Sequence, residues 1–277
     1  MSQINNLINS INSISEYIPL LFLTLVFIYF SYKKNILDKT GIITAIVIGI
    51  MIFIGGGWKF IAMISAFYIL GIATTNFKKS KKRINSITKE KSTTRSYTNV
   101  IANGGIASML ALSNIMIESE LLTIAFIGAI LTATADTIAT EIGLLSKSTP
   151  FLLLKPSKKC IKGESGGVTI LGLTSSFVSI LIIGIISMVL GVINTQYQII
   201  AIIIGGYSGN LLDSIIGGTI QRIGKCTECG NMTENMTHHN KKVTITRGNK
   251  NINNDVVNFI STIFGAIIAV IFYLAII

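Results

Sequence analysis

Charged side chains are scarce in this sequence. Asp, Glu, Lys and Arg make up 13% of its 277 residues, whereas soluble domains carry about 25%. Half of the residues are hydrophobic and the mean hydropathy is +0.67, so too few polar side chains remain to cover a water-facing surface. The composition therefore excludes an ordinary soluble enzyme and predicts an integral membrane protein.

An alternating pattern of hydrophobicity is also missing, because the apolar residues come in long blocks. A transmembrane β-barrel needs alternation along each strand, so helices are the remaining way to satisfy the backbone in lipid. Three cysteines are too few for a disulfide framework. The net charge of +11 would indicate nucleic acid in a soluble protein. In a membrane protein it first indicates cytoplasmic loops, and we expect no nucleic-acid partner.

Eight apolar blocks approach the roughly 20 residues that a helix needs to cross the hydrocarbon. They are Ile18–Tyr32, Gly41–Gly57, Trp58–Phe77, Val100–Met116, Leu121–Ala135, Val168–Ile193, Ile199–Ile220 and Val256–Ile277. We therefore expect an all-α fold, a polytopic transmembrane helical bundle of about eight spans that forms one integral membrane domain over residues 1–277. Residues 1–17 are polar and lack the positive charges that open a signal peptide.

The basic residues predict the orientation of the bundle. Of 23 Lys and Arg residues, 22 fall in four segments that share one side if the N-terminus is outside. These segments are residues 33–39, the basic loop 78–95, the basic Gly-rich loop 146–167 and the polar loop 221–254. The positive-inside rule places them in the cytoplasm of a multi-pass cell-membrane protein, with both termini outside. The basic run at 78–83 could also bind anionic lipid headgroups, although a topology signal alone would explain it.

Four acidic residues lie at the cytoplasmic ends of apolar blocks: Asp136, Glu141, Asp213 and Asp255. Ionisable groups in such places are costly and usually functional, and carboxylate oxygens suit Mg²⁺. We expect these four to bind Mg²⁺, with Asp136, Glu141 and Asp213 as catalytic residues. A five-residue spacing turns a straight helix by about 140° net, so Glu141 would join Asp136 on one ion only if the helix broke there. For Asp213 the alternative is a simple pair with a lysine.

A glycine-rich turn, Gly163-Glu-Ser-Gly-Gly167, follows several lysines and opens an apolar helix. Glycine lets the backbone approach a phosphate, and a helix N-terminus offers free N–H groups to it. The predicted phosphate ligands are Lys158, Lys159, Lys162, Gly163, Ser165, Gly166 and Gly167. The alternative is a basic loop that fixes topology and contains a glycine turn.

Cys226-Thr-Glu-Cys229, followed by His238-His239, is half of a zinc pattern. A structural zinc site normally has four protein ligands, and two adjacent histidines are awkward partners for one ion. The candidate Zn²⁺ ligands are Cys226, Cys229 and His239. The alternative is a set of solvent-exposed thiols and imidazoles that bind no metal.

Several motifs resemble the integral membrane family known as domain of unknown function 92. They are Arg95-x-x-x-Asn-Val-Ile-Ala-Asn-Gly104, Ala135-Asp-x-x-Ala-x-Glu-Ile-Gly143, Gly163-x-x-Gly-Gly-Val168, Gly209-x-x-x-Asp-Ser214, Cys226-x-x-Cys-Gly230 and Asn254-Asp-x-Val-Asn258. The family includes the plant phytyl-phosphate kinase of tocopherol synthesis and animal transmembrane protein 19. The resemblance adds Arg95, Asn103, Asn210 and Asn258 to the candidate substrate site.

The same segments are more distantly similar to the CTP-using dolichol and phytol kinases and phosphatidate cytidylyltransferases, in which an Asp occupies the position of Asn210. These resemblances imply a Mg²⁺-assisted kinase that phosphorylates a polyprenyl monophosphate, of phytyl or geranylgeranyl type, with a nucleotide such as CTP. One alternative is a cytidylyltransferase that makes a CDP-lipid at the same site. Another is a transporter of an anionic lipid or ion, which would place its charges near the membrane midplane.

Overall fold

The structure, a computed structural model, describes residues 2–84 and 94–277, and for residues 2–17 and 83–84 it describes the backbone alone. The helices are α1 Ser2–Lys33, α2 Lys39–Asn76, α3 Lys79–Ile84, α4 Tyr97–Ile117, α5 Glu120–Gly143, α6 Ile170–Val189, α7 Gln196–Thr219 and α8 Asn254–Ile276. All eight predicted apolar blocks overlap helices. The prediction of a polytopic helical membrane protein is confirmed, since six of these helices (α2 and α4 to α8) are long and apolar enough to cross a membrane.

Helix α2 is a hairpin of two helices that meet at Gly57, where the backbone leaves the helical region (φ 61°, ψ −155°). A straight helix of its 38 residues would be about 57 Å long. Its two ends instead return to Arg95: the Asp38 amide donates to the Arg95 carbonyl at 3.1 Å, and a Cβ on Gly71 would lie 3.9 Å from the Arg95 guanidinium. The break therefore matches the predicted boundary between the second and third apolar blocks.

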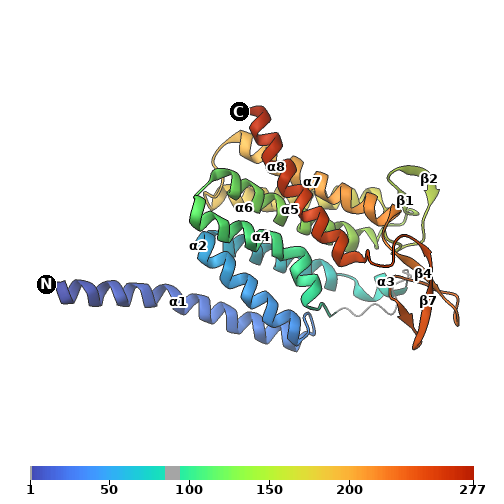
Figure 1. Cartoon of the computed structure of the whole chain (residues 1–277), viewed down its shortest axis with the longest axis horizontal. Coiled ribbons are helices and arrows are strands. Elements are labelled where there is room, and N and C mark those ends of the chain that lie inside the picture. Colours follow the sequence, from blue (N-terminus) through green and yellow to red (C-terminus); the bar gives the residue numbers. More distant parts are fainter. Residues whose placement is uncertain (1, 85–93) are drawn as a thin grey trace.

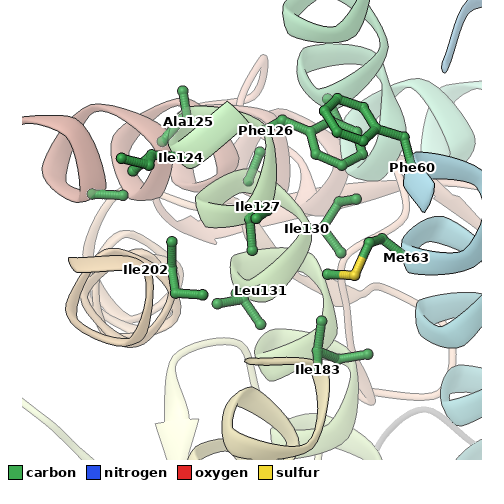
Figure 2. Packing of buried hydrophobic residues seen from close by; sticks show 14 of the residues in the cluster. Phe60, Met63, Ile124, Ala125, Phe126, Ile127, Ile130, Leu131, Ile183 and Ile202 are labelled. Carbon is green, nitrogen blue, oxygen red and sulfur yellow. The ribbon is translucent and has the colours of Figure 1, made fainter. Parts of the chain in front are cut away.

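The central helix is α5, whose apolar stretch is 72% buried, against 22–39% for the other five long helices. Figure 2 shows its side chains packed against helices on several sides. Phe126 stacks on Phe60 of α2 with ring centroids 4.0 Å apart, while Ile127, Ile130 and Leu131 belong to the same buried cluster as Ile183 of α6 and Ile202 of α7. Because the middle of α5 is enclosed by other helices, polar residues there contact protein on most sides.

Small residues allow α5, α7 and α8 to approach closely, as is typical of membrane helices. A Cβ on Gly209 of α7 would lie 2.3 Å from the Thr132 hydroxyl oxygen of α5, and one on Gly265 of α8 would lie 1.9 Å from it. Thr132 has room for its hydroxyl only because both neighbours are glycine. This contact determines which faces of α5, α7 and α8 point toward one another in the neighbouring helical turns.

Two small sheets lie together at one end of the bundle (Figure 1). Strands β1 Phe151–Leu152, β2 Lys155–Lys159 and β3 Gly167–Val168 form a sheet in the order β2-β1-β3. Strands β4 Ile223–Cys226, β5 Met232–Thr233, β6 Thr237–His238 and β7 Lys241–Arg247 form the second, in the order β5-β4-β7-β6. The sequence analysis expected plain loops at 146–167 and 221–254, so these sheets add to the all-α prediction.

The opposite end of the bundle carries the α2 break and the α4–α5 and α6–α7 connections. There Lys59 donates to the Gly191 carbonyl at 3.1 Å, and Glu120 accepts hydrogen bonds from Gln198 and Tyr273. The described parts of the segments predicted to lie inside are thus found at the opposite end of the molecule from those predicted to lie outside, and residues 85–93 of the basic loop lie outside the described residues.

Candidate functional site

A cavity of about 590 Å³ lies at the end of the bundle that carries the two sheets. Its walls are the ends of α2 and α4 to α8, the glycine-rich loop, and the segment between β5 and β6. It is lined by all four acidic residues that the sequence singled out: Asp136, Glu141, Asp213 and Asp255. Helices that are far apart in sequence therefore deliver these carboxylates to one place.

Asp136 of α5 and Asp213 of α7 face each other closely enough to share a hydrogen bond. Their meeting follows from the helix packing, because Asp136 lies one turn beyond Thr132 and Asp213 one turn beyond Gly209, and residues four apart share a helix face. Asp213 is buried. Asn258 of α8, in the amide orientation that satisfies both of its polar atoms, donates to Asp213 Oδ2 at 3.2 Å.

Two facing carboxylates repel each other unless a proton or a cation is shared between them. The surrounding donors are oxygen atoms of carboxylates, amides and hydroxyls, which hard cations such as Mg²⁺ prefer. The pair of Asp136 and Asp213, with Asn258 beside it, therefore fits a Mg²⁺ ion.

Glu141 is engaged in a different interaction. Its carboxylate forms a 2.7 Å ion pair with Lys82, whose side chain is buried, and accepts a hydrogen bond from Thr75 at 3.1 Å. Helix α5 continues without a break from Asp136 to Glu141, so the helix break that would have brought both carboxylates to one ion is absent. Glu141 therefore lies in the same cavity as the other acids, but its charge is paired with the ammonium group of Lys82.

Arg95 lies between these two groups of acids, in the connection that precedes α4. Burial lowers the pKa of its guanidinium, and the carboxylates of Glu141 and Asp136 oppose that shift. Because a guanidinium keeps its proton in proteins, Arg95 supplies a fixed positive charge at the cavity wall. Its backbone pairs with Leu37, which holds it against the start of α2.

Asp255 lies in the first turn of α8 and accepts hydrogen bonds from Thr98 (2.6 Å) and Asn99 (3.3 Å) of α4. These contacts join the starts of α4 and α8 at the rim of the cavity. Asn253 caps α8 through its side chain, which accepts from the Val256 amide at 2.9 Å. Asp255 thus lines the cavity and also links α8 to α4 through hydrogen bonds.

The glycine-rich loop forms another part of the cavity wall. Gly163, Ser165, Gly166 and Gly167 all line the cavity, and Thr169 caps α6 by accepting from the Gly172 amide at 3.0 Å. Lys162 also lines the cavity, and its amine donates to the Ser146 carbonyl. The loop, one lysine and the N-terminal turn of α6 thus line the same cavity as the acidic pair.

Gly166 has φ +77°, and a Cβ there would lie 2.0 Å from the Gly218 amide nitrogen at the end of α7. The sequence analysis explained this glycine by close approach of a phosphate. The structure gives a second reason why this position needs glycine: the loop backbone packs directly on the α7 backbone and leaves no space for a side chain.

Arg247 of β7 fastens the glycine-rich loop. Its guanidinium donates to Glu164 Oε1 (3.0 Å), to the Ser165 carbonyl (2.9 Å) and to the Gly217 carbonyl (3.0 Å). Ser165 in turn donates to Glu234, which lies between β5 and β6, and accepts from Gln221 at 3.0 Å. The second sheet therefore holds the loop in place at the cavity.

The remaining predicted residues divide into two groups. Asn103, with Arg95 and Asn258, lines the cavity. Lys158 and Lys159 lie on the exposed strand β2, where the Lys159 amine sits over the Phe151 ring, and neither is among the lining residues. Asn210 is buried within the bundle and donates to Ser176 at 3.1 Å, away from the lining. Of the three predicted lysines, the structure brings only Lys162 to the cavity.

Cys226 and Cys229 lie together in the second sheet, but the nearby imidazole is that of His238, not the predicted His239. The Cys229 sulfur is 3.5 Å from His238 Nδ1. Hydrogen bonds from the Cys229 backbone and the His238 side chain lower the pKa of the Cys226 thiol to about 6. None of Cys226, Cys229, His238 and His239 lines the cavity, so the cluster of Cys226, Cys229 and His238 is separate from it.

Sequence reasoning missed Lys82, Arg247 and Glu234 as parts of the site. Lys82 was hidden in a basic run that a topology signal alone would explain. Arg247 ends a segment of alternating polarity, Lys241–Arg247, which is a strand signal and could have suggested a folded unit. No local signal marks Glu234.

Comparison with known proteins gives a family and three relatives. The model of the integral membrane protein family DUF92 matches residues 22–266. An uncharacterized membrane protein of Methanocaldococcus jannaschii is 29% identical over 87% of each chain. Protein PGR of Arabidopsis thaliana is 28% identical over 83% of this chain and 87% of its own.

The chloroplastic protein VTE6 of Arabidopsis thaliana is 23% identical over 84% of this chain and 64% of its own length. No solved structure matches this chain. The family match covers the whole cavity wall, from the α2 hairpin to the α8 residues beside Asp213.

Proposed function

Because this chain belongs to the integral membrane protein family DUF92, we propose that it is a membrane-embedded kinase of an isoprenoid monophosphate. The reaction transfers the γ-phosphoryl group of a nucleoside triphosphate, CTP in the first instance, to the phosphate of a phytyl or geranylgeranyl-type lipid. The bond between the β and γ phosphates breaks, a new bond to the acceptor phosphate oxygen forms, and a nucleoside diphosphate leaves. This activity follows from the resemblance to the plant phytyl-phosphate kinase described above.

One observation carries the proposal: a single cavity contains both an acidic pair and a wall of glycine-rich backbone, lysine and a helix N-terminus. Asp136 and Asp213 line the same cavity as the glycine-rich loop, Lys162 and the start of α6. Phosphoryl transfer needs little covalent chemistry from the protein and depends on positioning and charge stabilisation. A site with both charge types, in a bundle whose outer helices expose large apolar side chains such as Phe22, Ile182 and Ile271, suits a phosphorylated lipid.

Mg²⁺ would be held by Asp136 and Asp213, with Asn258 and Asp255 nearby. When bound, Mg²⁺ neutralises negative charge on the nucleotide phosphates. The sequence analysis also assigned Glu141 to the metal. Since Glu141 pairs with Lys82, we propose instead that it keeps Lys82 in position at the cavity wall.

The cations and backbone amides would bind the phosphates. Lys162 and Arg95 contribute fixed positive charges, and the loop amides with the α6 N-terminus add hydrogen-bond donors. The loop keeps its shape through Arg247, which donates to Glu164 and to the Ser165 carbonyl. These groups would align donor and acceptor phosphates, which is the main source of rate enhancement in such reactions.

We also propose that the cavity faces the cytoplasm of a cell-membrane protein, where nucleotides are available. The support is the distribution of basic residues, 22 of 23 of which fall in the four segments 33–39, 78–95, 146–167 and 221–254. The lipid tail would lie between helices while its phosphate reaches the cavity at the interface.

The test is product analysis with the purified protein in lipid nanodiscs, with geranylgeranyl monophosphate as acceptor and CTP labelled in either the α or the γ phosphate. Transfer of the γ label to the lipid is the expected result, and Asp213→Asn serves as the inactive control. Transfer of the α label would replace the kinase with a cytidylyltransferase. If neither label reaches the lipid with any of the four common nucleoside triphosphates, the proposal is wrong, and the transport of an anionic lipid or ion becomes the hypothesis to test.

A further inference from the structure

A cluster of soft ligands lies in the second sheet, outside the cavity. Cys226 ends strand β4, Cys229 follows in the turn, and His238 ends strand β6. Their ligand atoms all lie within 4.8 Å of one another. Cys226 is buried and Cys229 is exposed, so the cluster is open to solvent on one side.

The turn between the two cysteines is a tight reversal held by backbone hydrogen bonds. The Cys226 amide donates to the Asn231 carbonyl (2.9 Å), and the Gly230 amide donates back to the Cys226 carbonyl (3.0 Å). Gly230 has φ +71°, which lets the chain reverse directly after Cys229. The backbone N–H groups of Cys229 and Glu228 both point at the Cys226 sulfur.

We propose that Cys226, Cys229 and His238 bind one Zn²⁺ ion, with solvent as the fourth ligand. Two thiolates and an imidazole are a set that zinc prefers, and the three atoms are already close enough to converge on one ion. His239 does not take part as a ligand. Its backbone has φ +51°, and its ring packs edge-to-face on His238 with centroids 4.2 Å apart, so it supports the imidazole that ligates.

The proposed ion would also act on the cavity from a distance. It would close a ring from Cys226 to His238, and this ring contains Glu234 and Asn235, which line the cavity. Glu234 accepts the hydrogen bond of Ser165 in the glycine-rich loop. Closing a loop with a metal removes conformational freedom from it. The ion is therefore expected to hold Glu234 at Ser165, whatever reaction the cavity catalyses.

The experiment measures metal directly and does not depend on activity. The full-length protein is purified in detergent through a tag without histidines, and its zinc content is determined by elemental analysis. We expect one zinc per chain in the wild type, and a loss of most of it in Cys229→Ser and in His238→Ala. The matched controls His239→Ala and Cys160→Ser should keep it. Retention of zinc in His238→Ala together with its loss in His239→Ala would overturn the ligand assignment.

A second measurement covers the case in which the variants fold poorly. Co²⁺ supplied to the metal-free wild type should produce the absorption bands of thiolate ligation, and hydrogen exchange of residues 163–167 should slow when the ion binds. A wild-type chain that contains no zinc and takes up no Co²⁺ would overturn the proposal. A disulfide between Cys226 and Cys229 in chains purified without reductant, with no metal present, would overturn it as well.

Discussion

Two carboxyl groups that face each other across a helix interface are stable only if they share a proton or a cation. Asp136 and Asp213 are such a pair, brought together by the contact of Thr132 with Gly209 one turn earlier. Removing either charge relieves the repulsion and at the same time removes a ligand from the proposed Mg²⁺ site. The two effects have opposite signs, one on stability and one on activity, and they can be measured separately.

We therefore predict that Asp136→Asn and Asp213→Asn each lower the rate of turnover by at least about 100-fold, the scale for losing one preorganised electrostatic group. Both variants should stay folded in the membrane, and their thermal unfolding without Mg²⁺ should occur at or above the wild-type temperature. Mg²⁺ should raise the unfolding temperature of the wild type but not of the variants. Near-normal turnover by either variant at saturating Mg²⁺ would exclude a shared metal site.

The three lysines of the basic Gly-rich loop differ in position, and we expect them to differ in effect. Lys162 lines the cavity, whereas Lys158 and Lys159 lie on exposed strand β2. Lys162→Ala should weaken use of the nucleotide or lipid phosphate by about 1.5–3 kcal/mol, the range for a hydrogen bond to a charged group. Lys159→Ala is the matched control and should change the KM little. Equal losses in both variants, measured as kcat/KM, would mean that the loop acts through its overall charge.

Among the structural elements, the glycine-rich loop and the end of α7 are in direct backbone contact, so the position of each depends on the other. Gly166 combines a positive φ with backbone contact to Gly218. Any side chain at this position would therefore be strained in its backbone conformation and would also clash with α7. We predict that Gly166→Ala lowers the free energy of unfolding by more than about 1–2 kcal/mol, the cost of the left-handed conformation alone. Gly49→Ala is the control, because a Cβ there has no atom within 4 Å. Unfolding of the detergent-solubilised variants provides the comparison, and a Gly166→Ala protein as stable as Gly49→Ala would contradict the packing.

The elements that could be predicted from sequence are those specified by local residues. Long apolar runs gave the helices, and Gly57 lies at the predicted boundary between two of them. The acids were found because charge at the end of an apolar block is conspicuous. The contacts that complete the site were not predictable in this way: Lys82 pairs with Glu141 across 59 positions, and Arg247 reaches Glu164 across 83. Such pairs depend on how the helices pack, which no short pattern encodes.

The same limit applies to predicted site residues that the structure does not bring together. Lys158, Lys159 and Lys162 are close in sequence, so a pattern cannot tell a strand that points into solvent from the turn that follows it. His238 and His239 are adjacent, and the positive φ of His239 decides which imidazole reaches the cysteines.

At the scale of the whole molecule, the chemistry is concentrated at one end of the bundle. The cavity and both sheets lie there, while Glu120 and the Lys59–Gly191 contact mark the other end. The positive-inside rule predicts that the cavity end is cytoplasmic. A kinase that uses a soluble nucleotide requires this orientation, so the topology is a test of the proposed function as well as of the fold.

We predict that the connection after α2 is cytoplasmic and that the α4–α5 turn is outside. The design starts from a chain in which Cys160, Cys226 and Cys229 are replaced by serine, since Cys229 is exposed and would react itself. Single cysteines are then introduced at the exposed positions Ser80 and Glu118. In intact cells an impermeant maleimide should label Glu118→Cys but reach Ser80→Cys only after the membrane is opened. The reverse pattern would place the cavity outside, away from cellular nucleotides, and would exclude a nucleotide-dependent kinase at this site, because the acidic pair and the glycine-rich loop lie at the same end as Ser80.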